Sequence, residues 1–182
     1  MQARFNTHNQ PAPINWAILD DNALAARAPL QVGMAQVRVG TRGDQLQALL
    51  GSCVGIGFIW KKRGRCALAH CLLPECGEAG NDLGARYVNQ AIPNMLRLMG
   101  ATEADFADIE VVVAGGATML NACSSRLQIG QQNADAARRL LRRYGLNVSY
   151  CRVGGKCGRT LTIDCNTCSY AVQEIVAGAA YA

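Results

Sequence analysis

The sequence predicts an α/β (α+β) fold in which β-strands outnumber two helices within one domain. The chain has 182 residues, half of them hydrophobic and 17% charged. A chain of this length and composition can bury a hydrophobic core without disulfide bonds or a structural metal ion. Alternating or β-branched apolar runs recur along the chain, and two other segments carry apolar residues at helical spacing. We therefore expect residues 30–182 to form a single domain. Residues 1–29, which are polar and contain prolines, are expected to form an N-terminal extension.

The composition argues against several classes of protein. Lysine and arginine together exceed the acidic residues by five, and aromatic residues make up 5% of the chain. The sequence therefore does not show the basic residues interleaved with base-stacking aromatic residues that are typical of a nucleic-acid-binding protein. The positive charge would suit an acidic protein partner. No stretch approaches the ~20 continuous apolar residues of a membrane span, and residues 1–13 lack the apolar segment of a signal peptide. Nine irregularly spaced cysteines favour a cytoplasmic protein with reduced thiols.

Closely spaced apolar residues predict the first strands. Apolar residues at positions 32, 34, 37 and 39 predict a strand that ends at a turn over residues 40–43, and residues 45–50 predict a second strand. The clearest alternation covers residues 53–60. Its even-numbered residues are large and apolar and share one face, whereas its odd-numbered residues, which include Cys53 and two glycines, share the other. Such glycines indicate a close approach to the backbone, either by a functional partner or by another packed element.

A charged turn at residues 61–65 joins this strand to a returning strand at residues 66–70. A turn centred on Arg63 would place His70 opposite Ile56, three residues from Cys53. At a rise of about 3.3 Å per residue, roughly 10 Å would separate them along the strand. The hairpin therefore predicts both residues at one end of the sheet, and a bend at Gly51-Ser52 or a shifted register would have to close the gap.

Two helices are predicted farther along the chain. An apolar stripe between residues 84 and 99 predicts the first, with either a kink at Pro93 or a start near that proline. Residues 131–144 predict the second, whose arginines form a basic face for solvent or for an acidic partner. Further strands are expected at residues 109–114, 148–153, 160–163 and 170–176. The polar loop at residues 75–84 is expected to border a cleft.

Metal and phosphate sites have weak support in the sequence. A structural zinc site needs two matched close pairs of ligands, and only Cys165 and Cys168 form such a pair. The same pair lacks the helix start that follows a redox motif. Glycine pairs at residues 115–116 and 154–155 match no phosphate-binding fingerprint and fit tight turns instead.

Cys53 and His70 are the best candidates for catalytic residues. Cys53 follows a Gly-Ser turn at the start of a strand, and His70 is expected at the same end of the sheet. A neutral imidazole near a thiol can take its proton, and the resulting ion pair stabilises the thiolate. Backbone amides of the Gly51-Ser52-Cys53 turn could also face a developing oxyanion. The pattern predicts a cysteine nucleophile with a histidine base.

Six motifs resemble, in order, those of the chemoreceptor glutamine deamidases, the CheD family of bacterial chemotaxis. They extend over residues 30–176, and the seventeen residues from Cys53 to His70 match the family's interval. The motifs are Leu50-Gly-Ser-Cys-Val54, Ala69-His70-x-x-Leu73-Pro74, Ala85-Arg-Tyr87-x-x-x-Ala91, Val113-Ala-Gly-Gly-Ala117, Ile129-Gly130-x-x-Asn133 and Val153-Gly-Gly-x-x-Gly158-Arg159.

The resemblance implies a layered sandwich of β-sheets with packed helices, similar to the cysteine-dependent deamidating toxins. It implies that Cys53 is the nucleophile and His70 the general base. The reaction would convert selected glutamine side chains of methyl-accepting chemotaxis proteins to glutamate through a thioester, with no metal or organic cofactor. The resemblance also implies binding of a CheC-type phosphatase, which competes with the receptor.

One position departs from the family pattern. The family places a threonine six residues before the cysteine to orient the histidine, and Gln47 occupies that position here. A glutamine carbonyl can accept a hydrogen bond from an imidazole N–H, so we expect Gln47 to be the third member of the site. The departure leaves an alternative open, a non-catalytic adaptor of the same fold that binds the chemoreceptor or a CheC-type phosphatase. A second enzymatic alternative is deamidation of a protein other than a receptor.

Overall fold

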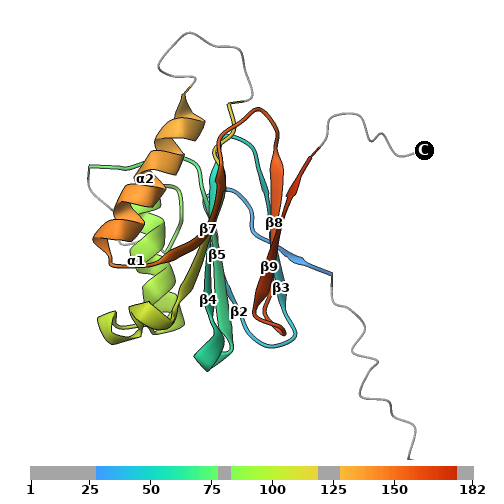
Figure 1. The fold of residues 1–182 in the computed structure, drawn as a ribbon, viewed down its shortest axis with the longest axis vertical. Helices are drawn as coiled ribbons and strands as arrows, with labels where there is room; N and C mark the ends of the chain where they lie inside the picture. The colour runs from blue at the N-terminus through green and yellow to red at the C-terminus, as the bar shows by residue number, and fades with distance from the viewer. Residues whose placement is uncertain (1–27, 78–82, 119–127, 176–182) are drawn as a thin grey trace, which may run out of the picture.

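Two β-sheets lie face to face, and two helices cover the outer face of one of them (Figure 1). The computed structural model describes residues 28–77, 83–118 and 128–175. The predicted α/β class with layered sheets and packed helices is confirmed. All but two residues of the predicted N-terminal extension lie outside the described residues.

The central layer is a five-stranded sheet with the order β2-β5-β4-β6-β7. Its strands are β2 (Val37–Gly40), β4 (Val54–Trp60), β5 (Arg65–Cys71), β6 (Glu110–Gly115) and β7 (Val148–Val153). The β6–β7 pair is parallel and the other pairs are antiparallel. Strand β4 is paired on both sides and buried along its whole length, as its nearly continuous apolar sequence requires.

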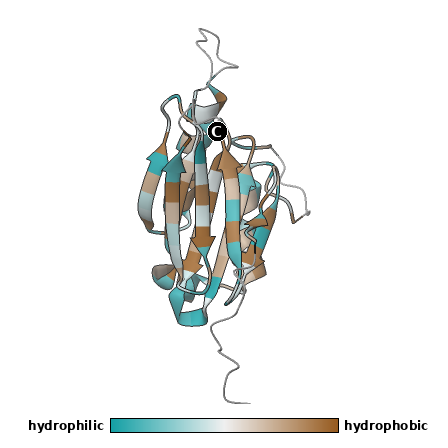
Figure 2. Ribbon diagram, turned by 90° about the vertical axis from the view of Figure 1, so that its right-hand side faces the viewer, coloured by the Kyte–Doolittle hydropathy of each residue, from teal (hydrophilic) through white to brown (hydrophobic). Residues whose placement is uncertain are grey.

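The outer layer is a four-stranded sheet with the order β1-β3-β8-β9. It consists of β1 (Leu30–Gln31), β3 (Gln45–Leu50), β8 (Arg159–Asp164) and β9 (Ser169–Glu174). Figure 2 views this sheet from its outer side, where hydrophilic and hydrophobic residues alternate along the strands. Alternation of buried and half-buried residues in β8 has the same origin, since one face meets the other sheet and one faces solvent.

Helices α1 (Val88–Met99) and α2 (Ile129–Arg143) pack their apolar stripes on the five-stranded sheet. Helix α1 begins at Val88, later than the predicted start at residue 84, and it continues through Pro93. Proline fixes a helical φ and removes a single hydrogen bond, so packing on the sheet outweighs its cost. Two short 3₁₀ helices, η1 (Lys61–Arg63) and η2 (Glu103–Asp108), precede β5 and β6. Neither helix in the described ranges is both long and apolar enough to cross a membrane.

The two faces of β4 serve different cores. The side chains of Val54, Ile56 and Phe58 pack with the helices, whereas Ile59 packs with the four-stranded sheet. A Cβ atom at Gly57 would lie 2.6 Å from Cδ1 of Ile163 in that sheet. The glycines of β4 therefore let the two sheets approach, which supports the packed-element interpretation of the sequence.

The single strand expected from residues 32 to 39 is wrong. Strand β1 ends at Gln31 in the outer sheet, and β2 begins at Val37 in the central sheet. Between them Met34 is 66% exposed and Ala35 has a φ of 63°. The apolar residues were misleading because they form two short alternations of different phase, one at residues 32 and 34 and one at residues 37 and 39, and not one strand. This crossing segment, residues 32–36, matters for the site.

Candidate active site

Cys53 and His70 lie at the same end of the central sheet. Cys53 ends the bend that joins β3 to β4, and His70 is the penultimate residue of β5. His70 pairs with Gly55, not with Ile56 as the turn centred on Arg63 predicted. The loop is a 3₁₀ turn closed by Gly64, whose φ is 58°, and it shifts the register by one residue.

The corrected register places both side chains on one side of the sheet. A shift of one residue moves a side chain to the opposite face, so the predicted register would have separated them. His70 alternates with Ala69 and Cys71 of the helix-side core, and Cys53 packs at the edge of the core between the sheets. Gly55, which pairs with His70, lies two positions after Cys53. The offset between His70 and Cys53 along the strand therefore falls from roughly 10 Å to about 7 Å.

The Nδ1 atom of His70 lies 3.0 Å from the carbonyl oxygen of Val32. A carbonyl oxygen only accepts, so Nδ1 carries the ring proton and donates it, and Nε2 keeps the lone pair of the neutral ring. The imidazole is 5% exposed, and this burial lowers the pKa of His70 although the Val32 hydrogen bond opposes the shift. Neutral imidazole with an available Nε2 is the form that can accept a proton.

The Cys53 thiol is half-buried, so it is accessible from outside while His70 is not. Partial burial raises the pKa of the Cys53 thiol, and a hydrogen bond from its own backbone N–H works in the opposite direction. The resting pair is therefore a neutral thiol and a neutral imidazole, so formation of a Cys53 thiolate would require transfer of the thiol proton to a base.

Backbone hydrogen bonds hold the Val32 carbonyl in place. The Val32 N–H donates to Gln47 O at 2.7 Å. His70 itself accepts from Ala35 N and donates to Gln36 O, both at 3.0 Å. The crossing segment is thus attached to both sheets at the position of the imidazole. Sequence reasoning missed this contact because a backbone carbonyl leaves no residue-type signal.

The side chain of Gln47 has other partners. Its amide oxygen accepts from Gln31 Nε2 at 2.8 Å, and its amide nitrogen donates to Thr162 Oγ1 at 3.0 Å. Leu46 and Ala48 on either side are fully buried, so Gln47 lies on the opposite, outer face of β3. The structure therefore brings Cys53 and His70 to one sheet end but shows the expected imidazole contact made by Val32 and not by the Gln47 side chain.

Three consecutive carbonyls fix the turn that carries Cys53. Gly51 O accepts from Ala117 N at 2.9 Å, and Cys53 O accepts from Gly116 N at 2.8 Å. Between them, Ser52 O accepts from the Asn133 side chain at 3.1 Å. A Cβ atom at Gly115, whose φ is 102°, would lie 2.3 Å from Cys53 O. Only glycine allows this approach.

Asn133 is the functional candidate that sequence reasoning did not assign. It lies on α2, is 0% exposed, and donates through Nδ2 to both Ser52 O and Leu72 O, the latter at 2.8 Å. Its Oδ1 is buried and accepts no hydrogen bond from the described residues. Such an unsatisfied atom costs about 1–3 kcal/mol. The sequence did contain a signal for it, because Asn133 is a polar residue on the apolar stripe of the helix, one turn before Ala137.

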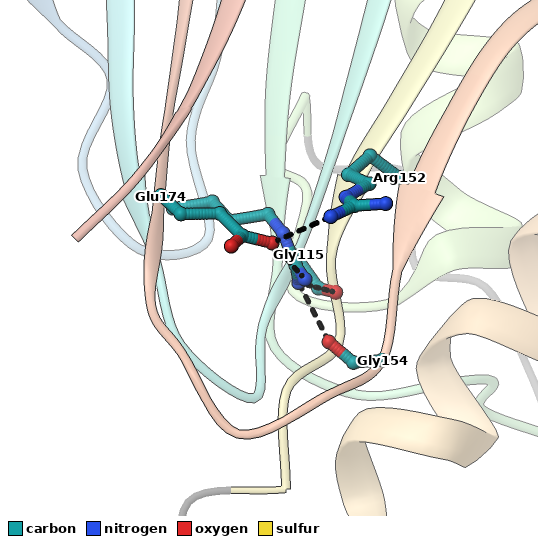
Figure 3. A network of polar contacts seen from close by, with 5 residues as sticks. Gly115, Arg152, Gly154 and Glu174 are labelled. Carbon is teal, nitrogen blue, oxygen red and sulfur yellow. Dashed lines mark hydrogen bonds and ion pairs between the residues drawn. The ribbon is translucent and has the colours of Figure 1, made fainter. Parts of the chain in front are cut away.

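A buried arginine supports the same turn from the outer sheet (Figure 3). The Arg159 guanidinium donates to Gly154 O at 2.7 Å and to Gly115 O at 3.3 Å, and it pairs with Glu174 at 3.0 Å. Glu174 also pairs with Arg152 at 3.2 Å, and both arginines lower the pKa of its carboxyl group. Because Gly115 precedes the residue that holds Cys53 O, Arg159 connects the outer sheet to the cysteine turn.

Other predicted features have separate locations. Within the described residues, no group of three or more potential ligands is arranged to hold a metal ion. A groove of about 830 Å³ lies between α1, η2 and the C-terminal end of α2, and neither Cys53 nor His70 lines it. Half of the polar loop expected to border a cleft, residues 78–82, lies outside the described residues.

Comparison with known proteins now identifies the family. The model of the family described as CheD chemotactic sensory transduction matches residues 72–174, which is more than half of the chain. The chain belongs to the CheD family. The resemblance found from the sequence motifs is thereby confirmed.

Relatives carry the same family name. A probable chemoreceptor glutamine deamidase CheD from Bdellovibrio bacteriovorus is 38% identical over 134 residues, which cover 72% of this chain and 86% of the relative. A protein named probable chemoreceptor glutamine deamidase CheD 2, from Ruegeria sp., is 36% identical over 80% of this chain and 92% of its own length. A probable CheD from Methanococcus vannielii is 33% identical over 74% of this chain and 88% of its own length.

Proposed function

We propose that this protein is a chemoreceptor glutamine deamidase with Cys53 as nucleophile and His70 as general base. One observation carries the mechanism: a half-buried thiol and a neutral imidazole with a hydrogen-bonded Nδ1 share one face at one sheet end. The names of the relatives supply the substrate class, glutamines of chemoreceptors.

The first half of the reaction forms a thioester. His70 Nε2 takes the thiol proton while Sγ of Cys53 bonds to the carboxamide carbon, and the carbonyl oxygen becomes an oxyanion. The imidazolium then gives this proton to the amide nitrogen. The C–N bond breaks, ammonia leaves, and the glutamine carbon remains bound to sulfur.

The second half consumes water and regenerates the enzyme. His70 Nε2 takes a proton from a water molecule as the water oxygen bonds to the thioester carbon. The C–S bond breaks, the imidazolium returns the proton to sulfur, and glutamate is released. The net reaction converts carboxamide and water to carboxylic acid and ammonia, and its steps use only Cys53, His70 and water.

The Val32 carbonyl is proposed to orient His70 in place of the family's threonine. Its 3.0 Å contact with Nδ1 selects the tautomer that the mechanism needs and fixes the plane of the ring. Gln47 would contribute through its backbone, because its carbonyl holds the Val32 N–H. The departure at Gln47 therefore no longer favours the non-catalytic adaptor over the enzyme.

The decisive experiment measures ammonia release from cognate receptor fragments, together with the mass gain of about one dalton that replacement of NH₂ by OH produces. Wild type should show both, and Cys53→Ala should show neither. Cys151→Ala, which removes an exposed thiol on β7, is the control that should retain activity.

Equal, background-level activity of wild type and Cys53→Ala would reject the enzyme. Capture of receptor or of a CheC-type phosphatase by the inactive protein would then favour the adaptor. Activity on glutamines of another protein, with none on receptors, would support the non-receptor alternative.

A further inference from the structure

We propose that Asn133 is a positioning residue that aims the backbone N–H of Cys53 at the oxyanion of the reaction. The inference rests on the proposed deamidation, because an oxyanion forms only when the thiolate attacks a carboxamide. It assigns a chemical purpose to a buried amide that the mechanism above does not use.

The argument begins with the peptide that joins Ser52 to Cys53. The described residues contain no cis peptide bond, and in a planar trans peptide the C=O and N–H bonds point in opposite directions. Asn133 holds the Ser52 carbonyl from the side of α2 at 3.1 Å. The N–H of Cys53 must therefore point away from α2.

The preceding peptide is fixed in a similar way. The Gly51 carbonyl accepts from Ala117 N at 2.9 Å, so the N–H of Ser52 points away from Ala117. Carbonyls of the turn are thus directed into the protein, and the N–H groups of Ser52 and Cys53 are directed away from those contacts. Adjacent backbone donors of this kind are the usual components of an oxyanion hole.

The chemistry of the Asn133 side chain fits this purpose. Both of its contacts are carbonyl oxygens, Ser52 O and Leu72 O, and its Nδ2 supplies one hydrogen to each. Leu72 comes directly after β5, which carries His70. One amide therefore joins the segment that carries Cys53 to the segment that carries His70. An aspartate at position 133 would have the same shape, but its oxygens only accept hydrogen bonds and could not bond to either carbonyl.

The amide is also preorganised by its helix. A Cβ atom at Gly130 would lie 2.6 Å from both Gly116 O and Ala117 O, so α2 packs directly on the backbone that holds the cysteine turn. Asn133 itself is fully buried. The donor cannot move away from Ser52 without disturbing this contact.

The test compares Asn133→Asp and Asn133→Ser with wild type. We expect kcat for deamidation to fall about 10²-fold, with KM changed less than about twofold because the side chain is buried away from substrate. Alkylation of Cys53 by iodoacetamide should change less than about twofold, because it depends on thiol activation and develops no oxyanion. Alkylation must be measured peptide by peptide, since Cys151 and Cys157 are exposed.

Asn94→Ala is the matched control. Asn94 is a buried amide on α1 whose Nδ2 donates to Gly84 O at 2.8 Å, so its loss reports the general effect of deleting such a side chain. We expect its kcat to stay within about twofold of wild type at a temperature where the protein is folded. If Asn133→Asp does not fold, the uncharged Asn133→Ser provides the result.

A folded Asn133 variant with wild-type kcat would overturn the inference and leave the proposed function intact. Parallel losses in kcat and in the alkylation rate would also overturn it, because they would indicate a changed distance between Cys53 and His70. A wild-type protein without deamidase activity would instead reject the proposed function on which the inference rests.

Discussion

Cys53 and Cys66 lie near opposite ends of the paired strands β4 and β5, and the pKa of both thiols is raised. Burial is the main cause for Cys53, whereas for Cys66 the hydrogen bond with the Cys165 thiol comes first and burial second. Both pack in the core between the sheets, but they differ in exposure and in the ionisable group beside them. Cys66 is fully buried, and the ionisable groups that act on it are the thiols of Cys165 and Cys168. Cys53 is half-buried and lies at the end of the sheet that carries His70. The comparison teaches that a buried thiol becomes a candidate nucleophile through access and a neighbouring base, and not through burial itself.

The two cysteines also differ in what holds them. Cys66 is part of a continuous ladder with β4 and β2. The Cys53 turn has no such ladder and depends on Gly116, Ala117 and Asn133 from later parts of the chain. Substitutions that disturb the contacts of the Cys53 turn should therefore affect catalysis. Substitutions that disturb the packing of Cys66 should affect the stability of the fold.

The largest contrast should come from removing each thiol. Cys53→Ala is expected to lower kcat/KM by at least about 10³-fold with little change in stability. Cys66→Ala should leave kcat/KM within about twofold and lower the free energy of unfolding by about 1–2 kcal/mol, because it leaves a small cavity. Kinetics and urea denaturation measure both. A catalytic loss in folded Cys66→Ala would break the comparison.

The next effect concerns the glycine against the Cys53 carbonyl. Gly115→Ala should lower kcat by about 10²-fold and destabilise the fold by several kcal/mol, since its Cβ would meet Cys53 O at 2.3 Å. Gly145→Ala is the control, because Gly145 also has a positive φ, 71°, but no atom lies within 4 Å of its Cβ position. It should cost only about 1 kcal/mol and preserve kcat. Similar effects at both positions would show that backbone strain, not the cysteine contact, dominates.

A smaller effect is expected from pH. His70 must be neutral to take the thiol proton, and burial lowers its pKa. Protonation, and with it the loss of kcat/KM, should therefore begin only below the usual histidine value of about 6.5, with roughly tenfold loss per further pH unit. A pH profile of kcat/KM on receptor fragments at constant ionic strength measures the midpoint. A midpoint at or above 6.5 would contradict the buried, Val32-bonded imidazole.

The smallest effect should come from Gln47. Its side chain is bonded to Gln31 and Thr162 on the outer face of β3, so Gln47→Ala should change kcat/KM by less than about twofold and leave the acidic midpoint unmoved. Gln31→Ala, which removes the other half of the same amide pair, is the matched control. A tenfold loss with a shifted midpoint in Gln47→Ala alone would restore that side chain to the role first expected for it.

Local patterns predicted most of the elements. Strands β3 to β9 and both helices were expected within a few residues, because alternation and helical spacing are set by neighbouring residues and by the face that each element buries. The long strand at 32–39 failed because it ignored the shift in phase between residues 34 and 37, where the chain changes sheets. The hairpin register failed by one residue because a 3₁₀ turn replaced the symmetrical turn assumed for residues 61–65.

The sequence by itself determined the family, the α/β class and the choice of Cys53 and His70 as candidates, because residue types and their spacing are properties of the chain. Tertiary structure alone decided that the two share a face, that the Val32 carbonyl contacts the imidazole, and that Asn133 holds the cysteine turn. These features depend on register, on backbone carbonyls and on contacts between residues 81 positions apart. Physical proximity of that kind arises only when sheets and helices pack together.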